Sequence, residues 1–158
     1  MGAGKTTISH LLHSKLPRTA LLSMDKIKWI LSDFQRSEDY TLVSKVIIVM
    51  GETFLEQGCN LLIEQAFWKK EYVQPYIDLA NKFKVDLYFY QLEAPMKILK
   101  DRAKGRPDTP GKPPMTKKRI EENLKKWQEN RYELGKTFDT TKFSSEEIAQ
   151  LIIKDLGL

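Results

Sequence analysis

Short apolar runs alternate with segments of helical periodicity along this chain. The runs at residues 19–24, 60–63 and 85–92 predict strands, and the nearly continuous run at 85–92 is typical of a strand covered on both faces. Apolar positions at helical spacing predict helices near residues 6–16, 26–31, 42–58, 69–83, 95–102, 120–134 and 144–156. Strands alternating with helices imply parallel βαβ units, so the predicted fold class is a three-layer α/β/α sandwich with a parallel sheet.

Several element boundaries carry their own signals. Pro17 ends the first helix, and Gly58 is a C-terminal stop for the long third one. Ser144 and Glu147 have the spacing of a capping box, which predicts the start of the last helix. Residues 105–114 hold four prolines and two glycines, so this stretch predicts a loop.

Composition narrows the class of protein. The 158 residues, of which 41% are hydrophobic and 30% charged, suit one globular domain spanning residues 1–158. No apolar run approaches membrane-spanning length and no signal-peptide pattern opens the chain, so we expect no membrane partner. The single Cys59 excludes an internal disulfide and suits a reducing, cytoplasmic location.

The formal net charge of +5 leaves two functions open. A basic surface can attract an anionic substrate such as a nucleotide, or it can hold nucleic acid. The basic residues gather between Lys97 and Lys126. Such a local cluster fits a phosphate-handling flap at least as well as a nucleic-acid track.

The clearest chemical signal stands at the first residues. Gly4-Lys5-Thr6 is the closing half of a P-loop, whose full pattern is G-x-x-x-x-G-K-[ST]. Lys5 would reach the β- and γ-phosphates of ATP, and the Thr6 hydroxyl would bind Mg²⁺. The helix that follows adds the positive end of its dipole. The predicted nucleotide-binding residues, called the half-loop below, are Gly2, Ala3, Gly4, Lys5, Thr6 and Thr7.

The P-loop pattern is incomplete. Its opening glycine would lie two residues before Met1, and the strand that normally precedes such a loop is absent. We therefore expect that an internal methionine was taken as the start. The alternative is a Gly-Ala-Gly tail that happens to precede a helix.

Two carboxylates follow predicted strands, where ligands of parallel sheets bind. Asp25 could accept the proton of an attacking hydroxyl as a catalytic base, and its alternative role is a helix N-cap. Glu64 has the setting of a metal-binding acid that holds Mg²⁺ directly or through water, and its alternative is a solvated strand end.

Two arginines, Arg102 and Arg106, flank the turn into the proline-rich loop. Planar guanidinium groups clamp phosphate oxygens and neutralise the charge that develops during phosphoryl transfer, so both are predicted to be catalytic together with Lys5. An ordinary solvated helix end is the alternative.

Together these motifs resemble the small P-loop kinases of the nucleoside-monophosphate-kinase class, especially the group with polynucleotide kinase-type domains, zeta toxins and chloramphenicol phosphotransferase. The half-loop matches the family's phosphate loop. The segment Met24-Asp25-Lys26-Ile27-Lys28 is similar to the family's D-x-I-R, and residues 58–64 to its G-x-x-V-I-x-D strand. Leu92-Glu93-Ala94-Pro95, followed by the two arginines, resembles the approach to the family's lid.

The resemblance implies a five-stranded parallel sheet in the order 2-3-1-4-5 and MgATP-dependent transfer of the γ-phosphate. It also implies a lid at about residues 102–118 and an adenine near residues 139–142. The chain departs from the family where the first, central strand is missing, where Lys28 replaces arginine and where Glu64 replaces aspartate. The lysine weakens any transfer of a two-pronged substrate contact.

Three functions therefore follow from the sequence. The first is a phosphotransferase acting on a hydroxyl of a small molecule or of a nucleic-acid end. The second is a nucleotide-binding module without transfer activity, and the third is a basic nucleic-acid-binding protein. The sequence identifies neither the acceptor nor the oligomeric state.

Overall fold

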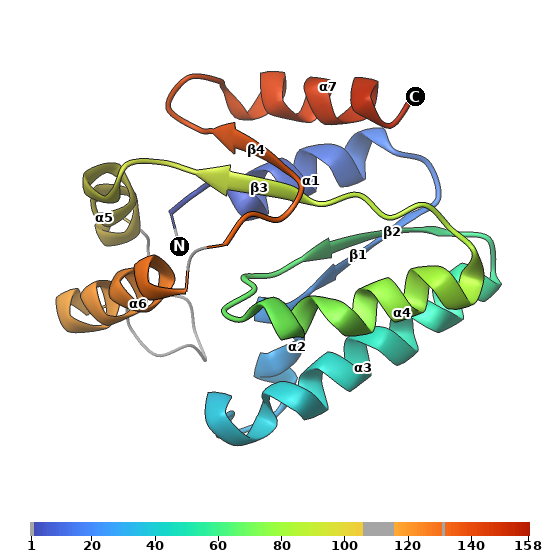
Figure 1. Cartoon of the computed structure of the whole chain (residues 1–158), viewed down its shortest axis with the longest axis horizontal. Helices are drawn as coiled ribbons and strands as arrows, with labels where there is room; N and C mark the ends of the chain where they lie inside the picture. The colour runs from blue at the N-terminus through green and yellow to red at the C-terminus, as the bar shows by residue number, and fades with distance from the viewer. Residues whose placement is uncertain (1, 106–115, 131) are drawn as a thin grey trace. The chain divides into compact units, whose positions relative to one another are not determined.

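The computed structural model describes residues 2–105, 116–130 and 132–158 (Figure 1). The predicted lid therefore lies largely outside the described residues, and so does Arg106. The described elements, in chain order, are α1 (Lys5–Lys15), β1 (Thr19–Ser23), α2 (Met24–Ile27), the 3-10 helix η1 (Lys28–Ile30), α3 (Arg36–Glu56), β2 (Asn60–Glu64), the 3-10 helix η2 (Lys70–Val73), α4 (Gln74–Phe83), β3 (Tyr90–Glu93), α5 (Met96–Lys104), α6 (Lys117–Glu129), β4 (Lys136–Asp139) and α7 (Ser145–Asp155).

These elements form two compact units. The first, called the half-loop unit, contains Met1–Ile8 and Tyr88–Leu158, and the second, called the Asp25 unit, contains Ser9–Leu87. Helix α1 begins in the half-loop unit and ends in the Asp25 unit. Each unit is described by itself, and folding of the whole chain as one domain stays a prediction.

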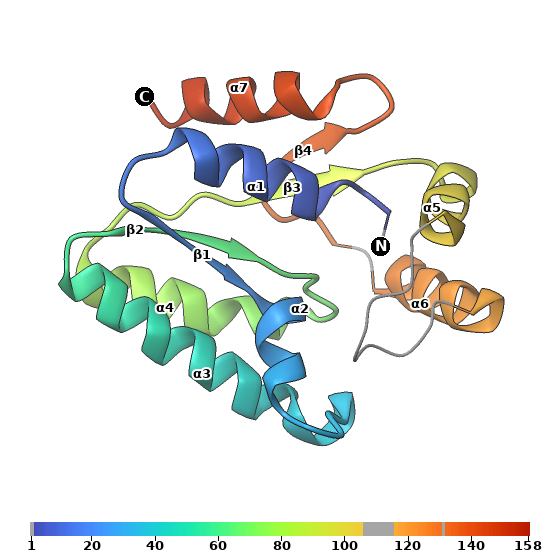
Figure 2. The same ribbon diagram turned by 180° about the vertical axis from the view of Figure 1, so that it is seen from behind.

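The Asp25 unit is a parallel strand pair covered by helices. Strands β1 and β2 pair from Thr19 with Asn60 to Ser23 with Glu64, and α3 and α4 lie side by side along them (Figures 1 and 2). The alternation of short apolar strands with long amphipathic helices produces this layering, because each element buries one face against the next. One cluster of buried core residues consists of Leu22, Met24, Ile27, Tyr40, Val43, Ile47 and Tyr76.

The half-loop unit contains a second strand pair, β3 and β4. These strands are also parallel and pair from Tyr90 with Lys136 to Glu93 with Asp139. The capping box predicted at Ser144 and Glu147 is present at the start of α7. A second core cluster joins the half-loop to α5 and α6 through Ala3, Ala94, Leu99, Ala103, Ile120 and Leu124.

Both strand pairs confirm the predicted parallel α/β fold class. If the first strand of the resembling family is counted as strand 1, then β1 to β4 are strands 2 to 5. The observed neighbours, β1 with β2 and β3 with β4, are then the pairs 2-3 and 4-5 of the expected order. The connections between paired strands pass through helices, as parallel pairing requires.

The prediction of one strand over residues 85–92 is wrong. Strand β3 begins only at Tyr90. The side chains expected to be covered are exposed instead, with relative exposures of 40% or more at Val85, Leu87 and Tyr88. Val85 instead donates its N–H to the Ala80 carbonyl and closes the end of α4. A strand forms only where backbone groups find a partner, and β4 offers its ladder only from residue 136 onward.

The long helix α3 also differs from its prediction. It begins at Arg36, six residues before the predicted start. Only part of its apolar positions face the core: Val43 and Ile47 are buried, whereas Leu42 and Val46 are exposed. The apolar pattern is wider than one buried stripe, so periodicity alone overstated the buried face.

Candidate functional site

The half-loop has the backbone shape of an anion-binding nest. Gly2 and Gly4 both have left-handed backbone conformations, with φ of +72° and +82°, and the intervening Ala3 is buried. Helix α1 starts at Lys5, and its first hydrogen bond across the boundary runs from Ile8 N–H to the Gly4 carbonyl at 3.0 Å. The first N–H groups of such a helix point out of its N-terminus, where anions bind.

Close packing against α5 fixes the position of the half-loop. A Cβ atom added to Gly2 would lie 2.8 Å from the Leu99 carbonyl oxygen and 3.4 Å from the Arg102 Cβ. Ala3 packs in the same cluster as Leu99 and Ala103. Glycine at position 2 is therefore required by its backbone conformation and by the close approach of α5.

Arg102 connects the half-loop to the segment after β4. Its Nη1 donates to Thr140 Oγ1 at 2.8 Å and to the Gly2 carbonyl at a longer 3.4 Å. Its Nη2 donates to the Thr140 carbonyl at 3.0 Å. The sequence placed Arg102 near phosphate, and the structure brings it to the half-loop; the direct phosphate contact stays a prediction.

Thr140 was not singled out from the sequence, since a threonine after a short strand gives no signal of its own. The structure holds it firmly, because its N–H and Oγ1 both donate to the Glu93 carbonyl, at 2.8 and 3.1 Å. Next to it, Asp139 Oδ1 accepts from the hydroxyl and the N–H of Thr141. These hydrogen bonds hold the pKa of the Asp139 carboxyl below its ordinary value of 3.8. Residues 139–142 are the segment at which the resemblance places adenine.

In the Asp25 unit, both predicted carboxylates lie at one edge of the strand pair. Ser23 and Glu64 are register partners at the carboxyl ends of β1 and β2, and Asp25 follows two residues after Ser23. Glu64 is buried and Asp25 is exposed. The structure thus brings the predicted base and the predicted metal-binding acid to the same sheet edge.

The N-cap alternative for Asp25 is wrong. The N-cap of α2 is Ser23, and Asp25 lies inside the first helical turn. Its Oδ1 instead accepts a hydrogen bond from the Lys28 ammonium. The side chain is therefore engaged in an ion pair rather than in capping the backbone.

A tyrosine forms a hydrogen bond with Gln65, the residue after Glu64. Tyr76 on α4 donates its hydroxyl to Gln65 Oε1 at 2.8 Å, and burial raises the pKa of this hydroxyl above its ordinary value. Phe67 packs edge-on against the same ring, with centroids 5.5 Å apart. These contacts fix the chain immediately after Glu64, at the carboxyl end of β2.

The predicted residues therefore fall into two groups. The half-loop unit brings together the half-loop, Arg102 and Thr140, and the Asp25 unit brings together Asp25 and Glu64. Within the described ranges 2–105, 116–130 and 132–158, no group of three or more histidine, cysteine or acidic side chains could hold a metal by itself. Across those same residues, no helix is long and apolar enough to cross a membrane.

The donor set of the half-loop fits a nucleotide phosphate with its metal. Backbone N–H groups at a helix start, a lysine ammonium and a threonine hydroxyl are the groups that bind triphosphates and Mg²⁺. The two left-handed glycines supply the concave backbone that this chemistry requires. The carboxylate of Glu64 is an oxygen donor of the kind that Mg²⁺ prefers.

Comparisons with known proteins identify a family and similar solved structures. A family model described as an AAA domain matches residues 1–134. Among solved structures, the chain resembles the tunicamycin resistance protein of Deinococcus radiodurans at a TM-score of 0.65 and 16% identity, covering 99% of this chain and 91% of that one. It also resembles a candidate kinase of Chloroflexus aurantiacus at a TM-score of 0.68 and 21% identity, covering 98% and 90%. No curated protein matches the chain significantly.

Proposed function

The chain belongs to the AAA domain family, and on that premise we propose that it is a kinase which transfers the γ-phosphate of MgATP to a hydroxyl acceptor. The family and the fold support a kinase-like, nucleotide-binding function. The acceptor class we propose is an alcohol of a small molecule or the hydroxyl end of a nucleic acid.

One observation carries the proposal. The half-loop, whose two glycines have left-handed conformations, packs directly on α5 and shares Arg102 with the turn after β4. A Gly-Ala-Gly tail without function would not need glycine where a Cβ atom meets a carbonyl oxygen at 2.8 Å. The packing thus favours a built phosphate loop over a tail that happens to precede a helix.

The proposed reaction is a single displacement. The acceptor oxygen forms a bond to the γ-phosphorus while the bond from that phosphorus to the β–γ bridging oxygen breaks, which releases ADP. The proton of the acceptor hydroxyl goes to the Asp25 carboxylate. Lys5, Arg102 and Arg106 neutralise the charge on the transferring group. Thr6 and Glu64 would hold Mg²⁺, which would neutralise phosphate charge when bound.

The test is phosphate transfer from labelled ATP to a pooled library of metabolites and 5′-hydroxyl oligonucleotides. We expect Mg²⁺-dependent label in an acceptor product with the wild-type protein. Lys5→Met should abolish it, since the variant removes the charge and keeps the length of the side chain. Lys82→Met is the matched control, because Lys82 is an exposed lysine paired with Glu52 in the other unit.

Two results would count against the proposal. Calorimetric binding of MgATP without transfer to any acceptor would support the nucleotide-binding module instead. Oligonucleotide binding that weakens steeply with salt, in the absence of nucleotide binding, would support the nucleic-acid-binding protein.

A further inference from the structure

Lys28 is a buried lysine whose ammonium contacts an exposed carboxylate. The side chain of Lys28 is 10% exposed, whereas that of its partner Asp25 is 66% exposed. The two residues lie one helical turn apart, because Asp25 is in the first turn of α2 and Lys28 directly follows that helix. The buried member of the pair is thus fixed by its surroundings, and the exposed member is held by it.

Two aromatic rings complete the surroundings of the ammonium. Lys28 Nζ lies 5.1 Å from the ring centroid of Trp29 and 5.9 Å from that of Phe34. The two rings pack edge-on against each other, with centroids 6.1 Å apart. An aromatic face attracts a cation and thereby offsets part of the cost of removing it from water. These contacts therefore hold the Lys28 side chain in one place.

We propose that Lys28 is a positioning residue that aims the Asp25 carboxylate at the acceptor hydroxyl, from which this carboxylate takes the proton. The inference rests on the proposed kinase function. Lys28 acts on the catalytic base Asp25 and not on the substrate. Its ammonium is directed at Asp25 Oδ1 and is flanked by Trp29 and Phe34. The exposed carboxylate of Asp25 is the group that contacts the acceptor.

A double-mutant cycle tests the proposal. Asp25→Asn should lower kcat by about 100-fold or more, the usual contribution of a general base. Lys28→Met, which keeps an unbranched side chain at this position, should lower kcat by about tenfold or more without changing the KM for ATP. In the Asp25→Asn background, the same substitution should change kcat by less than about twofold, since its effect passes through Asp25.

Two further variants separate positioning from general structural support. Lys28→Arg keeps a cation and should restore most of kcat. Lys82→Met removes a lysine that also pairs with a carboxylate and lies over an aromatic ring, at 2.7 Å from Glu52 and 5.4 Å from the Phe83 centroid, but is exposed. It should leave kcat unchanged. Additive losses for Lys28→Met and Asp25→Asn, or no rescue by arginine, would overturn the proposal.

A measurement that needs no turnover keeps this inference separate from the proposed function. The ammonium protons of a buried, hydrogen-bonded lysine exchange slowly enough for detection by ¹H–¹⁵N NMR. We expect one such signal in the wild-type protein, its loss in Lys28→Met and its loss or large shift in Asp25→Ala. If the signal behaves this way and no acceptor is phosphorylated, the kinase proposal fails and the ion pair stands. If Asp25→Ala leaves the signal unchanged, the positioning role fails.

Discussion

Arg102 shows how a single side chain can organise chain segments that are remote in sequence. It is 100 residues from Gly2 and 38 from Thr140, and its guanidinium donates to both. Planar nitrogen donors in fixed directions suit this use, and a lysine ammonium does not reproduce them. Arg102 therefore contributes to the shape of the half-loop as well as to its charge.

Arg102→Lys should weaken nucleotide binding while keeping the net charge. The variant loses the paired hydrogen bonds to Thr140, each of which typically contributes about 1 kcal/mol, so we expect ATP affinity to fall about tenfold. Calorimetric titration with MgATP measures this change. Arg18→Lys is the control, because Arg18 donates at 2.8 Å to the Gln57 carbonyl in the Asp25 unit. Equal affinities of the wild type and Arg102→Lys would show that charge alone matters.

Gly2→Ala should destabilise the half-loop unit and impair nucleotide binding. The added methyl would meet the Leu99 carbonyl oxygen at 2.8 Å in a backbone conformation that L-residues disfavour by roughly 1–2 kcal/mol. Thermal unfolding and MgATP titration measure the two effects. Gly58→Ala has a similar φ of +68° with no atom within 4 Å of the new Cβ, so it isolates the backbone cost. Should both variants behave alike, the close packing on α5 would be irrelevant.

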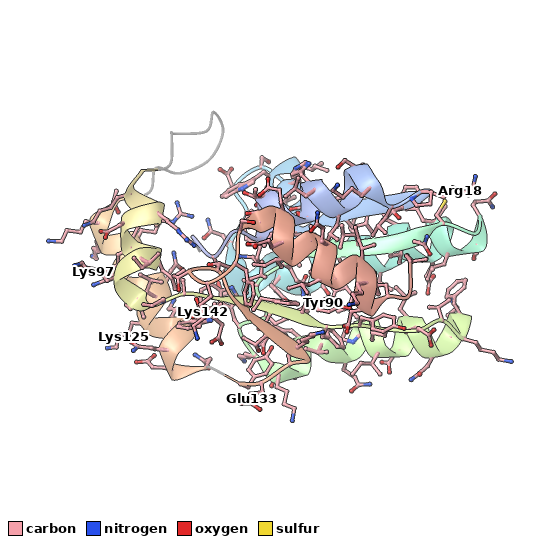
Figure 3. All side chains as sticks on the ribbon, turned by 90° about the horizontal axis from the view of Figure 1, so that it is seen from above. Arg18, Tyr90, Lys97, Lys125, Glu133 and Lys142 are labelled. Atoms are coloured by element: carbon pink, nitrogen blue, oxygen red, sulfur yellow. The ribbon has the colours of Figure 1, made fainter. Side chains whose placement is uncertain are left out.

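At the scale of elements, a three-residue network fastens α7 to the β3–β4 pair. Asp155 at the end of α7 accepts from Lys136 Nζ at 2.8 Å and from the Tyr90 hydroxyl at 2.9 Å, and Tyr90 is labelled in Figure 3. The Lys136 hydrogen bond and then that of Tyr90 hold the pKa of Asp155 below its ordinary value of 3.8. Burial is the main cause that raises the pKa of the Tyr90 hydroxyl, and the neighbouring Asp155 raises it further.

This network predicts an acid-dependent loss of stability. A carboxyl whose pKa is lower in the folded state stabilises the fold above its unfolded pKa, here 3.8, and this contribution is lost as the pH falls through the folded value. We expect Asp155→Asn to lower the free energy of unfolding at pH 7. At about pH 2 to 3, which is below the ordinary pKa of 3.8, the substitution should have little effect. Denaturant unfolding at both pH values measures the difference. The same loss at both would exclude the ionised carboxylate as its source.

Sequence patterns predicted local elements well, but they predicted strand pairing and contacts between distant residues poorly. The strands at β1 and β2, the capping box at Ser144 and the half-loop each depend on neighbouring residues, so their patterns are visible in the sequence. Residues 85–89 have strand-like composition, yet pairing decides whether a strand forms, and pairing depends on residues far along the chain. Hydrogen bonds to Glu93 and Arg102 fix the position of Thr140, and no pattern in the neighbouring sequence predicts these contacts.

At the scale of the whole molecule, the proposed chemistry divides between the two units. The residues assigned to phosphate binding lie in the half-loop unit, and those assigned to the acceptor proton and the metal lie in the Asp25 unit, apart from Thr6. The half-loop unit also carries the exposed Lys97, Lys125 and Lys142, which are labelled in Figure 3 and add to the net charge of +5. Nucleotide binding and proton transfer can therefore be altered by separate substitutions.

MgATP should stabilise the wild-type protein against unfolding. A ligand that binds only the folded state at 100 times its Kd adds about 2.7 kcal/mol, which raises Tm by several degrees for a chain of this size. Thermal unfolding with and without MgATP measures the shift. Lys5→Met should lose most of it, whereas Asp25→Asn should keep it, because Asp25 is assigned to the acceptor. A shift of the same size in Lys5→Met would place the nucleotide away from the half-loop.

The packing of the half-loop on α5 also affects when this loop can form during synthesis. Residues 2 and 3 leave the ribosome well before the residues that contact them, which are Leu99, Ala103 and Ile120. At 5–20 residues per second, translation reaches those partners only after on the order of ten seconds. These glycines are thus ordered long after they emerge, and a nascent chain cannot hold a nucleotide there until α5 and α6 have been translated.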